Sequence, residues 1–188
     1  MKSLLADIKK CTVCLPHLDN GVNPVVAAAA DSKIVIIGQA PGAIVHQSGV
    51  PWRDKSGDRL REWLQMSEED FYNPQITALI PMGFCYPGKG KSGDLPPRPE
   101  CAPLWHDKLL QQMQAVKLTL LVGQYAQKYY LGNTKKRTLT ATVRNFRDYL
   151  PTYLPLPHPS PRNNIWLSKN PWFEKEVLPE LREQVKGF

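Results

Sequence analysis

The chain contains four short apolar runs, and each is followed by glycine, proline or polar positions. They lie at 33–37, 76–80, 118–122 and 153–156. The first is mostly β-branched and ends at Gly38, which is typical of a strand buried on both faces of a parallel sheet. Helical segments are expected between and around the runs, at 4–10, 58–66, 100–116, 123–130, 138–149 and 170–186.

This alternation predicts an α/β fold, specifically a three-layer α/β/α sandwich on a short, mostly parallel, four-stranded sheet. Residues 81–99 form a long loop rich in proline and glycine, and loops of that length are usually functional or tied down. We expect residues 1–188 to form a single domain, in which 1–32 supply an N-terminal helix, a cysteine pair and a wrapping arm.

Two proline-containing loops follow predicted strands. The first is Gly38-Gln39-Ala40-Pro41-Gly42, and the second runs from Leu156 to Asn164. Prolines on both sides of His158 hold its backbone extended. Ligands of open α/β sheets bind outside the carboxyl ends of strands, so both loops are candidate site elements. A His-Pro-Ser-Pro segment alone fits an ordinary turn as well as a catalytic loop.

The overall charge favours an anionic partner. A formal charge of +7 and a pI near 9.3 make a polyanion plausible, with nucleic acid as the first candidate. No apolar stretch approaches the length of a membrane span, and the first residues lack an apolar signal core. We therefore expect a soluble, cytoplasmic, monomeric protein without a membrane partner.

The four cysteines are spaced as metal ligands. Cys11 and Cys14 form a C-x2-C pair, and Cys85 and Cys101 a C-x15-C pair. In a cytoplasmic protein this spacing indicates metal ligation better than disulfides. Zinc and an iron–sulfur cluster both accept four thiolates, and buried, unligated thiols are the third possibility.

The two loops, in this order and separation, resemble the signature motifs of the uracil-DNA glycosylase superfamily. The resemblance covers nearly the whole chain and implies that the loops face each other across a pocket for an extruded base. The cysteine pattern is similar to the cluster ligands of family 4, which implies a [4Fe-4S] cluster, with zinc as the alternative. The HPSPRN loop is closer to that of the single-strand-selective family.

The resemblance also implies roles in base excision. His158 would be a neutral donor that stabilises negative charge on the departing base. Gln39 stands where family 4 has Glu, and Ala40 where the best-known enzymes have a water-activating Asp. This implies a dissociative mechanism in which water is captured late and Gln39 positions it. Asp54 and Asp58 are reserve candidates for handling water.

The remaining implied roles concern the base and the DNA. Backbone groups of the first motif would hold the uracil and its sugar, through Gly38, Ala40, Pro41 and Gly42. Trp52 matches the aromatic residue that stacks on the base, and Arg162 the residue that enters the minor groove. Phosphate contacts and the basic surface would come from Ser160, Asn163, Asn164, Lys89 and Lys91.

One position departs from the superfamily pattern. The expected base-reading Asn at the end of the second strand is replaced by Ala78, which would weaken the selection of uracil. Backbone groups around Met82 and Gly83 could read the base instead, or the base could be hypoxanthine or xanthine. We expect a monofunctional DNA glycosylase acting on a deaminated base. The alternative is a catalytically inert, metal-stabilised nucleic-acid-binding module.

Overall fold

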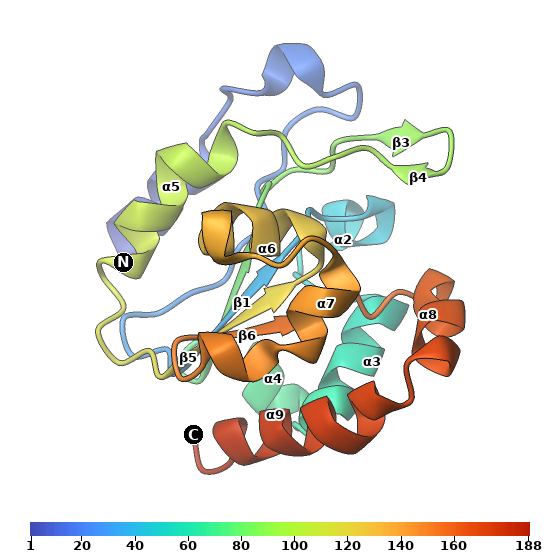
Figure 1. Cartoon of the computed structure of the whole chain (residues 1–188). Helices are drawn as coiled ribbons and strands as arrows, with labels where there is room; N and C mark the ends of the chain where they lie inside the picture. Colours follow the sequence, from blue (N-terminus) through green and yellow to red (C-terminus); the bar gives the residue numbers. More distant parts are fainter.

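A four-stranded parallel sheet forms the centre of the computed structural model, which describes all residues from 1 to 188 (Figure 1). Its strands are β1 (Ile34–Gly38), β2 (Thr77–Pro81), β5 (Leu118–Val122) and β6 (Tyr153–Leu156), in the order β2-β1-β5-β6. All neighbouring strands are parallel. Each strand lies within one residue of its predicted position.

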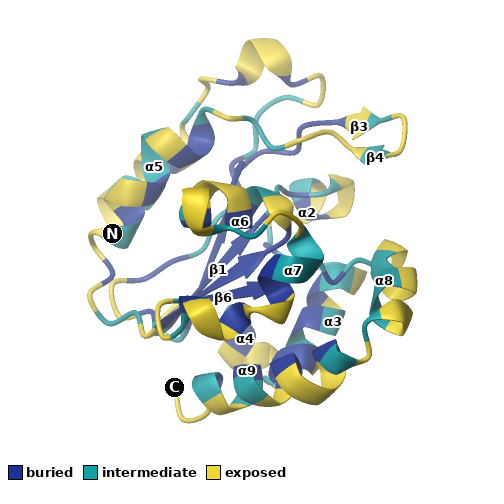
Figure 2. Cartoon of the chain, viewed as in Figure 1, coloured by how far each residue is buried: buried dark blue, intermediate teal, exposed yellow.

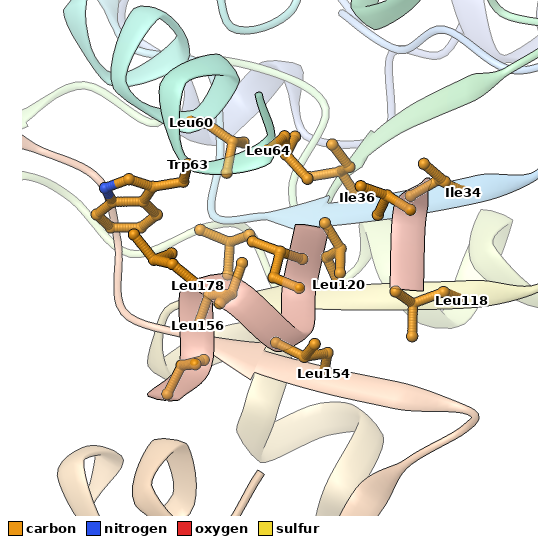
Figure 3. Packing of buried hydrophobic residues seen from close by; sticks show 14 of the residues in the cluster. Ile34, Ile36, Leu60, Trp63, Leu64, Leu118, Leu120, Leu154, Leu156 and Leu178 are labelled. Carbon is orange, nitrogen blue, oxygen red and sulfur yellow. The ribbon is translucent and has the colours of Figure 1, made fainter. Parts of the chain in front are cut away.

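Helices cover both faces of this sheet, because successive strand residues point to opposite sides. On one face Ile34, Ile36 and their neighbours pack against α3 (Lys55–Leu64) and α9 (Leu178–Val185), as Figure 3 shows. The same cluster includes residues of α4 (Glu68–Tyr72) and α7 (Leu139–Arg144). On the other face Val35, Ile37 and Leu121 pack against α1 (Lys2–Lys9), α5 (Cys101–Leu110) and α6 (Gln124–Leu131). β1, β2 and β5 are buried throughout and β6 is buried except at Tyr153 (Figure 2), and the predicted three-layer fold is confirmed.

The helices differ from prediction mainly where short polar contacts set their ends. The helix expected from residue 58 begins at Lys55, because Asp54 caps it by accepting hydrogen bonds from the amides of Ser56 and Gly57, each at 3.0 Å. Residues 100–116 are helical only to Leu110. Residues 138–149 divide into α7 and a 3₁₀ turn, and 170–186 into a π-helical turn followed by α9.

Several short elements were not predicted. They are α2 (Ala43–Ser48), α4, α8 (Asn164–Lys169) and an antiparallel hairpin of β3 (Lys89–Gly90) and β4 (Gly93–Asp94) within the long loop. In Figure 1 this hairpin projects from the body on the side of α2. None of these elements is long enough to show a hydrophobic period.

The N-terminal arm runs along the edge of the sheet. Ala27 and Leu79 exchange two backbone hydrogen bonds as an antiparallel bridge, and the Val25 amide donates to the Phe84 carbonyl. The arm thereby covers the otherwise open edge of β2. No helix in the structure has the length and apolar character needed to span a bilayer.

Candidate active site

A cavity of ≈ 470 Å³ lies at the carboxyl ends of the strands. Because β2 and β5 flank β1 on opposite sides, the connections after β1 and β5 diverge and leave a crevice between them, the usual ligand site of this architecture. The structure brings both predicted loops to this one cavity. Its walls include Gly38, Gln39, Ala40, Pro41, Gly42, Trp52, Asp54, Pro81, Asp94, Gln124, Tyr125, His158, Ser160, Arg162 and Asn163.

His158 is held in a single neutral form. The Ser160 amide donates to its Nδ1 atom at 3.2 Å, so Nδ1 carries no hydrogen and Nε2 carries it. Burial lowers the pKa of His158 below its usual value, although the nearby carboxylates of Asp54 and Asp94 partly oppose this shift. The imidazole is therefore an uncharged N–H donor at neutral pH.

Side chains from distant segments fix the loop that carries His158. The Asn163 side-chain amide donates to the His158 carbonyl at 2.6 Å. Arg59, on α3, donates to the Ser160 carbonyl at 3.3 Å and to the Asn164 side chain at 2.8 Å. Arg59 was not predicted as a site residue, since its contacts span more than a hundred positions of the chain.

Trp52 and His158 line the cavity together, with ring centroids 5.7 Å apart and planes tilted by 30°. The Trp52 indole lies directly on Gly38, where a Cβ atom would be 2.7 Å from Cζ2. The backbone of Trp52 has a φ of 58°, which is rare for a bulky residue, and the Tyr72 hydroxyl donates to its carbonyl at 3.1 Å. Such strained residues cluster at functional sites.

Hydrogen bonds after β2 hold the glycine-rich loop in place. The amides of Met82 and Gly83 donate to the carbonyls of Gly38 and Gln39, at 2.9 and 3.0 Å. These two amides are therefore not available to read the base, and neither Met82 nor Gly83 lines the cavity. The amides of Gln39, Ala40 and Gly42 have no acceptor within the chain, so they are free to bind a ligand.

Ala78 does not reach the cavity, which corrects its predicted place in the base pocket. It is fully buried within β2, paired with Val35 and packed in the core. The strand meets the cavity only at Pro81, three residues later. The Pro81 carbonyl is itself occupied, since it lies 3.1 Å from Nε2 of the buried His106. No β2 side chain is thus available to read a base edge.

Basic side chains surround the mouth of the cavity. Arg162 lines it and donates to the Ser92 carbonyl at 3.4 Å, which joins the HPSPRN loop to the β3–β4 hairpin. Lys89 and Lys91 are exposed on this hairpin but do not line the cavity. Gln124 and Tyr125 line it from the start of α6, and their position directly after a strand end could have indicated them.

The four cysteines meet at a second, small cavity. Cys11 and Cys14 come from the N-terminal arm, Cys85 from the long loop and Cys101 from α5, and all four are free thiols. Burial raises the pKa of Cys101 to about 12 and also raises the pKa of Cys14 and Cys85. No three Cys, His, Asp or Glu side chains converge closely enough to hold a metal ion.

The rest of this second cavity is lined by apolar residues. Val22, Pro24, Phe84 and Trp105 complete its walls. The indole Nε1 of Trp105 is buried and has no hydrogen-bond acceptor. A buried donor without a partner is uncommon and costs free energy, so an acceptor such as a metal-bound sulfur would satisfy it.

The parallel sheet brings a glycine-rich loop, an indole and a neutral imidazole together around one cavity at its strand ends. The family model of the uracil DNA glycosylase superfamily matches residues 25–182. A Type-4 uracil-DNA glycosylase of Thermotoga maritima is 30% identical over 190 residues, covering 96% of this chain and 90% of that protein. The chain belongs to the uracil-DNA glycosylase superfamily, and the expected class of enzyme, a DNA glycosylase, is confirmed.

Proposed function

We propose that this enzyme excises uracil from DNA, with His158 as the group that stabilises the departing base. The observation that carries this proposal is the neutral, Nε2-protonated imidazole that lines the same cavity as Trp52 and the glycine-rich loop. When the bond between C1′ and the base breaks, its electron pair moves to the base and charge collects on the carbonyl oxygens. One preorganised donor at such an oxygen typically lowers the barrier by about 3–4 kcal/mol.

Neighbouring groups would orient the base. An extruded uracil would stack on Trp52, and base–aromatic stacking contributes about 1–3 kcal/mol. The free amides of Ala40 and Gly42 are suited to its carbonyl oxygen and the adjacent sugar. The Gln39 side chain, which makes no hydrogen bond within the chain and lines the cavity, would position the water.

The surface around the cavity would bind the DNA backbone. Arg162 would fill the gap left by the extruded base and contact phosphates, in the way that basic side chains use the minor groove. Ser160, Asn163 and Asn164 would add polar contacts, and Lys89 and Lys91 would extend the basic surface. We also propose that the enzyme acts as a monomer in the cytoplasm, since a single chain supplies all the walls of the cavity.

We propose uracil as the main substrate, with weaker selection against other deaminated bases. The similar Thermotoga protein is named a uracil-DNA glycosylase. No side-chain amide from β2 reaches the cavity, however, and polar readout supplies most discrimination between similar ligands. The enzyme should therefore release hypoxanthine or xanthine more readily than an enzyme with the usual Asn.

We propose that Cys11, Cys14, Cys85 and Cys101 hold a [4Fe-4S] cluster. One zinc ion draws its thiolates to about 2.3 Å from a single centre, whereas a cluster binds each thiolate through a different iron. Four thiols from three separate segments of the chain line one cavity, which fits a group held by four thiolates. The apolar walls and the unpartnered Trp105 N–H also fit a sulfur-rich group. When bound, the cluster would link the arm, the long loop and α5.

A panel assay tests the proposed function. Purified enzyme should release free uracil from single-stranded and mispaired oligonucleotides, and His158→Ala should lower the rate by about 100- to 1,000-fold without weakening DNA binding. Parallel oligonucleotides carrying hypoxanthine or xanthine measure base selection. Release of no deaminated base, combined with intact DNA binding, would favour the inert binding module instead.

A further inference from the structure

We propose that Asp94, on the β3–β4 hairpin, is the carboxylate that accepts the proton of the attacking water. This inference rests on the proposed glycosylase activity. The first motif carries Gln39 and Ala40, neither of which can take up a proton at neutral pH. The long loop, which showed no regular pattern in the sequence, folds back and supplies a carboxylate to the same cavity.

The position of Asp94 is set by contacts with both motifs. Its Oδ2 atom lies 3.6 Å from the position that a Cβ atom on Gly42 would take, so the carboxylate lies against the end of the glycine-rich loop. Its hairpin is joined to the HPSPRN loop by the hydrogen bond from Arg162 to the Ser92 carbonyl. The carboxylate is also close enough to His158 for its charge to act on the imidazole.

Asp94 has no ion-pair partner, although basic residues surround it. Lys89 is opposite Asp94 in the hairpin ladder, and Arg162 packs against Gly93, yet neither forms a salt bridge with its carboxylate. An unpaired negative charge beside a DNA-binding surface weakens phosphate binding. A carboxylate at this place is therefore better explained by chemistry than by affinity for DNA.

Asp54 is the other carboxylate of the cavity, and it is already engaged. Its Oδ1 accepts hydrogen bonds from two backbone amides as the cap of α3. Protonation of this carboxylate would weaken both hydrogen bonds and the start of the helix that follows Trp52. The Asp94 carboxylate instead faces a side chain, the Tyr86 hydroxyl, whose pKa is raised mainly by burial and also by the Asp94 charge and a hydrogen bond to it.

The reaction balances with Asp94 in this role. The bond between C1′ and the base nitrogen breaks, and the base leaves with the electron pair while His158 donates a hydrogen bond to its oxygen. Water adds to the electron-deficient C1′ and gives one proton to Asp94. That proton then passes to the departed base anion, leaving an abasic sugar with a hydroxyl at C1′ and a neutral free base.

The test compares Asp94→Asn, Asp94→Glu and Asp94→Ala with the unchanged enzyme in single-turnover assays on uracil-containing DNA. Asp31→Asn, at an exposed position away from the cavity, is the control for lost charge. Asp94→Asn should lower the rate by about 100-fold while DNA binding stays equal or becomes tighter. Asp94→Glu should recover part of the rate, and added formate should partly restore Asp94→Ala.

The outcomes separate this proposal from the proposed function. A rate within twofold of the unchanged enzyme for Asp94→Asn would overturn the role of Asp94, while uracil release itself would remain. A parallel loss of rate and DNA binding, without recovery by Glu or formate, would assign Asp94 a structural role and also overturn the proposal. Absence of release by the unchanged enzyme would reject the proposed function.

Discussion

At the scale of single residues, the site depends on close approach between a glycine and an indole. Trp52 occupies the space that a side chain on Gly38 would need. The indole can therefore lie close to the end of β1, where it lines the cavity. Two contacts stabilise the strained backbone of Trp52. The Tyr72 hydroxyl donates a hydrogen bond to its carbonyl, and Gly57 has no side chain, so the Trp52 carbonyl can occupy the space that a Cβ atom would take.

Gly38→Ala should displace the indole and lower the excision rate more than it lowers stability. The added methyl group would lie 2.7 Å from Cζ2 of the ring, closer than unbonded carbons pack. Single-turnover rates and urea unfolding measure the two effects. Adding Trp52→Phe, which removes the overlapping part of the ring, should restore part of the lost rate. If the double variant is slower than Gly38→Ala alone, this packing explanation is wrong.

His106 should make the stability of the protein fall at acid pH. Burial lowers its pKa to about 4, and its ring nitrogens lie at 2.7 Å from the Tyr130 hydroxyl and 3.1 Å from the Pro81 carbonyl. Between pH 6.5 and 4 the unfolded chain binds a proton that the folded chain does not. The free energy of unfolding should therefore drop by about 3 kcal/mol across this window from His106 alone.

Urea unfolding at several pH values measures this effect. His106→Gln keeps an amide donor for Pro81 and an acceptor for Tyr130 but cannot be protonated, so the variant should show a flatter dependence on pH. His17→Gln, at an exposed position, is the matched control and should leave the dependence unchanged. Equal slopes for both variants would contradict the assignment to His106.

Individual site residues were predictable where a strand end fixed their position. Gln39 and His158 follow β1 and β6 closely, so both reach the cavity as expected. The prediction that Ala78 lies in the base pocket was wrong. The residue that reaches the crevice is the last one of β2, and the apolar run does not show at which residue this strand ends. Arg59 and Asp94 lie near the site because distant segments of the chain meet there, and no local sequence pattern indicates such contacts.

At the scale of elements, the helix cap of α3 links stability to the site. Asp54 begins this helix and lies two residues after Trp52. Asp54→Ala should lower the free energy of unfolding by about 1 kcal/mol, since two amides lose their acceptor. Asp54→Ser should recover most of this loss, because a serine hydroxyl also caps helices. Urea unfolding compares the variants, and a Ser variant no more stable than the Ala variant would argue against the capping role.

The bounds of the buried strands could be predicted from the sequence, whereas the short, more exposed elements could not. β5 and β6 match their predicted bounds, since an apolar run must span the whole buried length of a strand. The hairpin and α2, α4 and α8 depend on turns and caps, and they are too short to show a period. Two of these short elements, α2 and the hairpin, form part of the cavity wall. The architecture was therefore easier to predict than the shape of the site.

At the scale of the whole molecule, two centres organise the chain on either side of the segment that follows β2. The catalytic cavity draws on both motifs, and the cysteine cavity joins the arm, the long loop and α5. Residues 81–88 are buried without interruption between these centres. The Met82 and Gly83 amides fix the glycine-rich loop, and Cys85 follows two residues later. Loss of order at the cysteines should therefore reach the catalytic cavity.

Anaerobically purified enzyme should be brown and contain about four irons and four sulfides per chain. Cys85→Ser should lower the iron content, slow uracil excision and expose the arm before Val25 to limited proteolysis, because the arm would lose its link to the loop and α5. Trp105→Phe should keep the iron but shift the reduction potential to more negative values, since the indole N–H would no longer stabilise the reduced cluster. A colourless preparation with one zinc per chain would contradict the cluster, and an unchanged potential would contradict the hydrogen bond from Trp105.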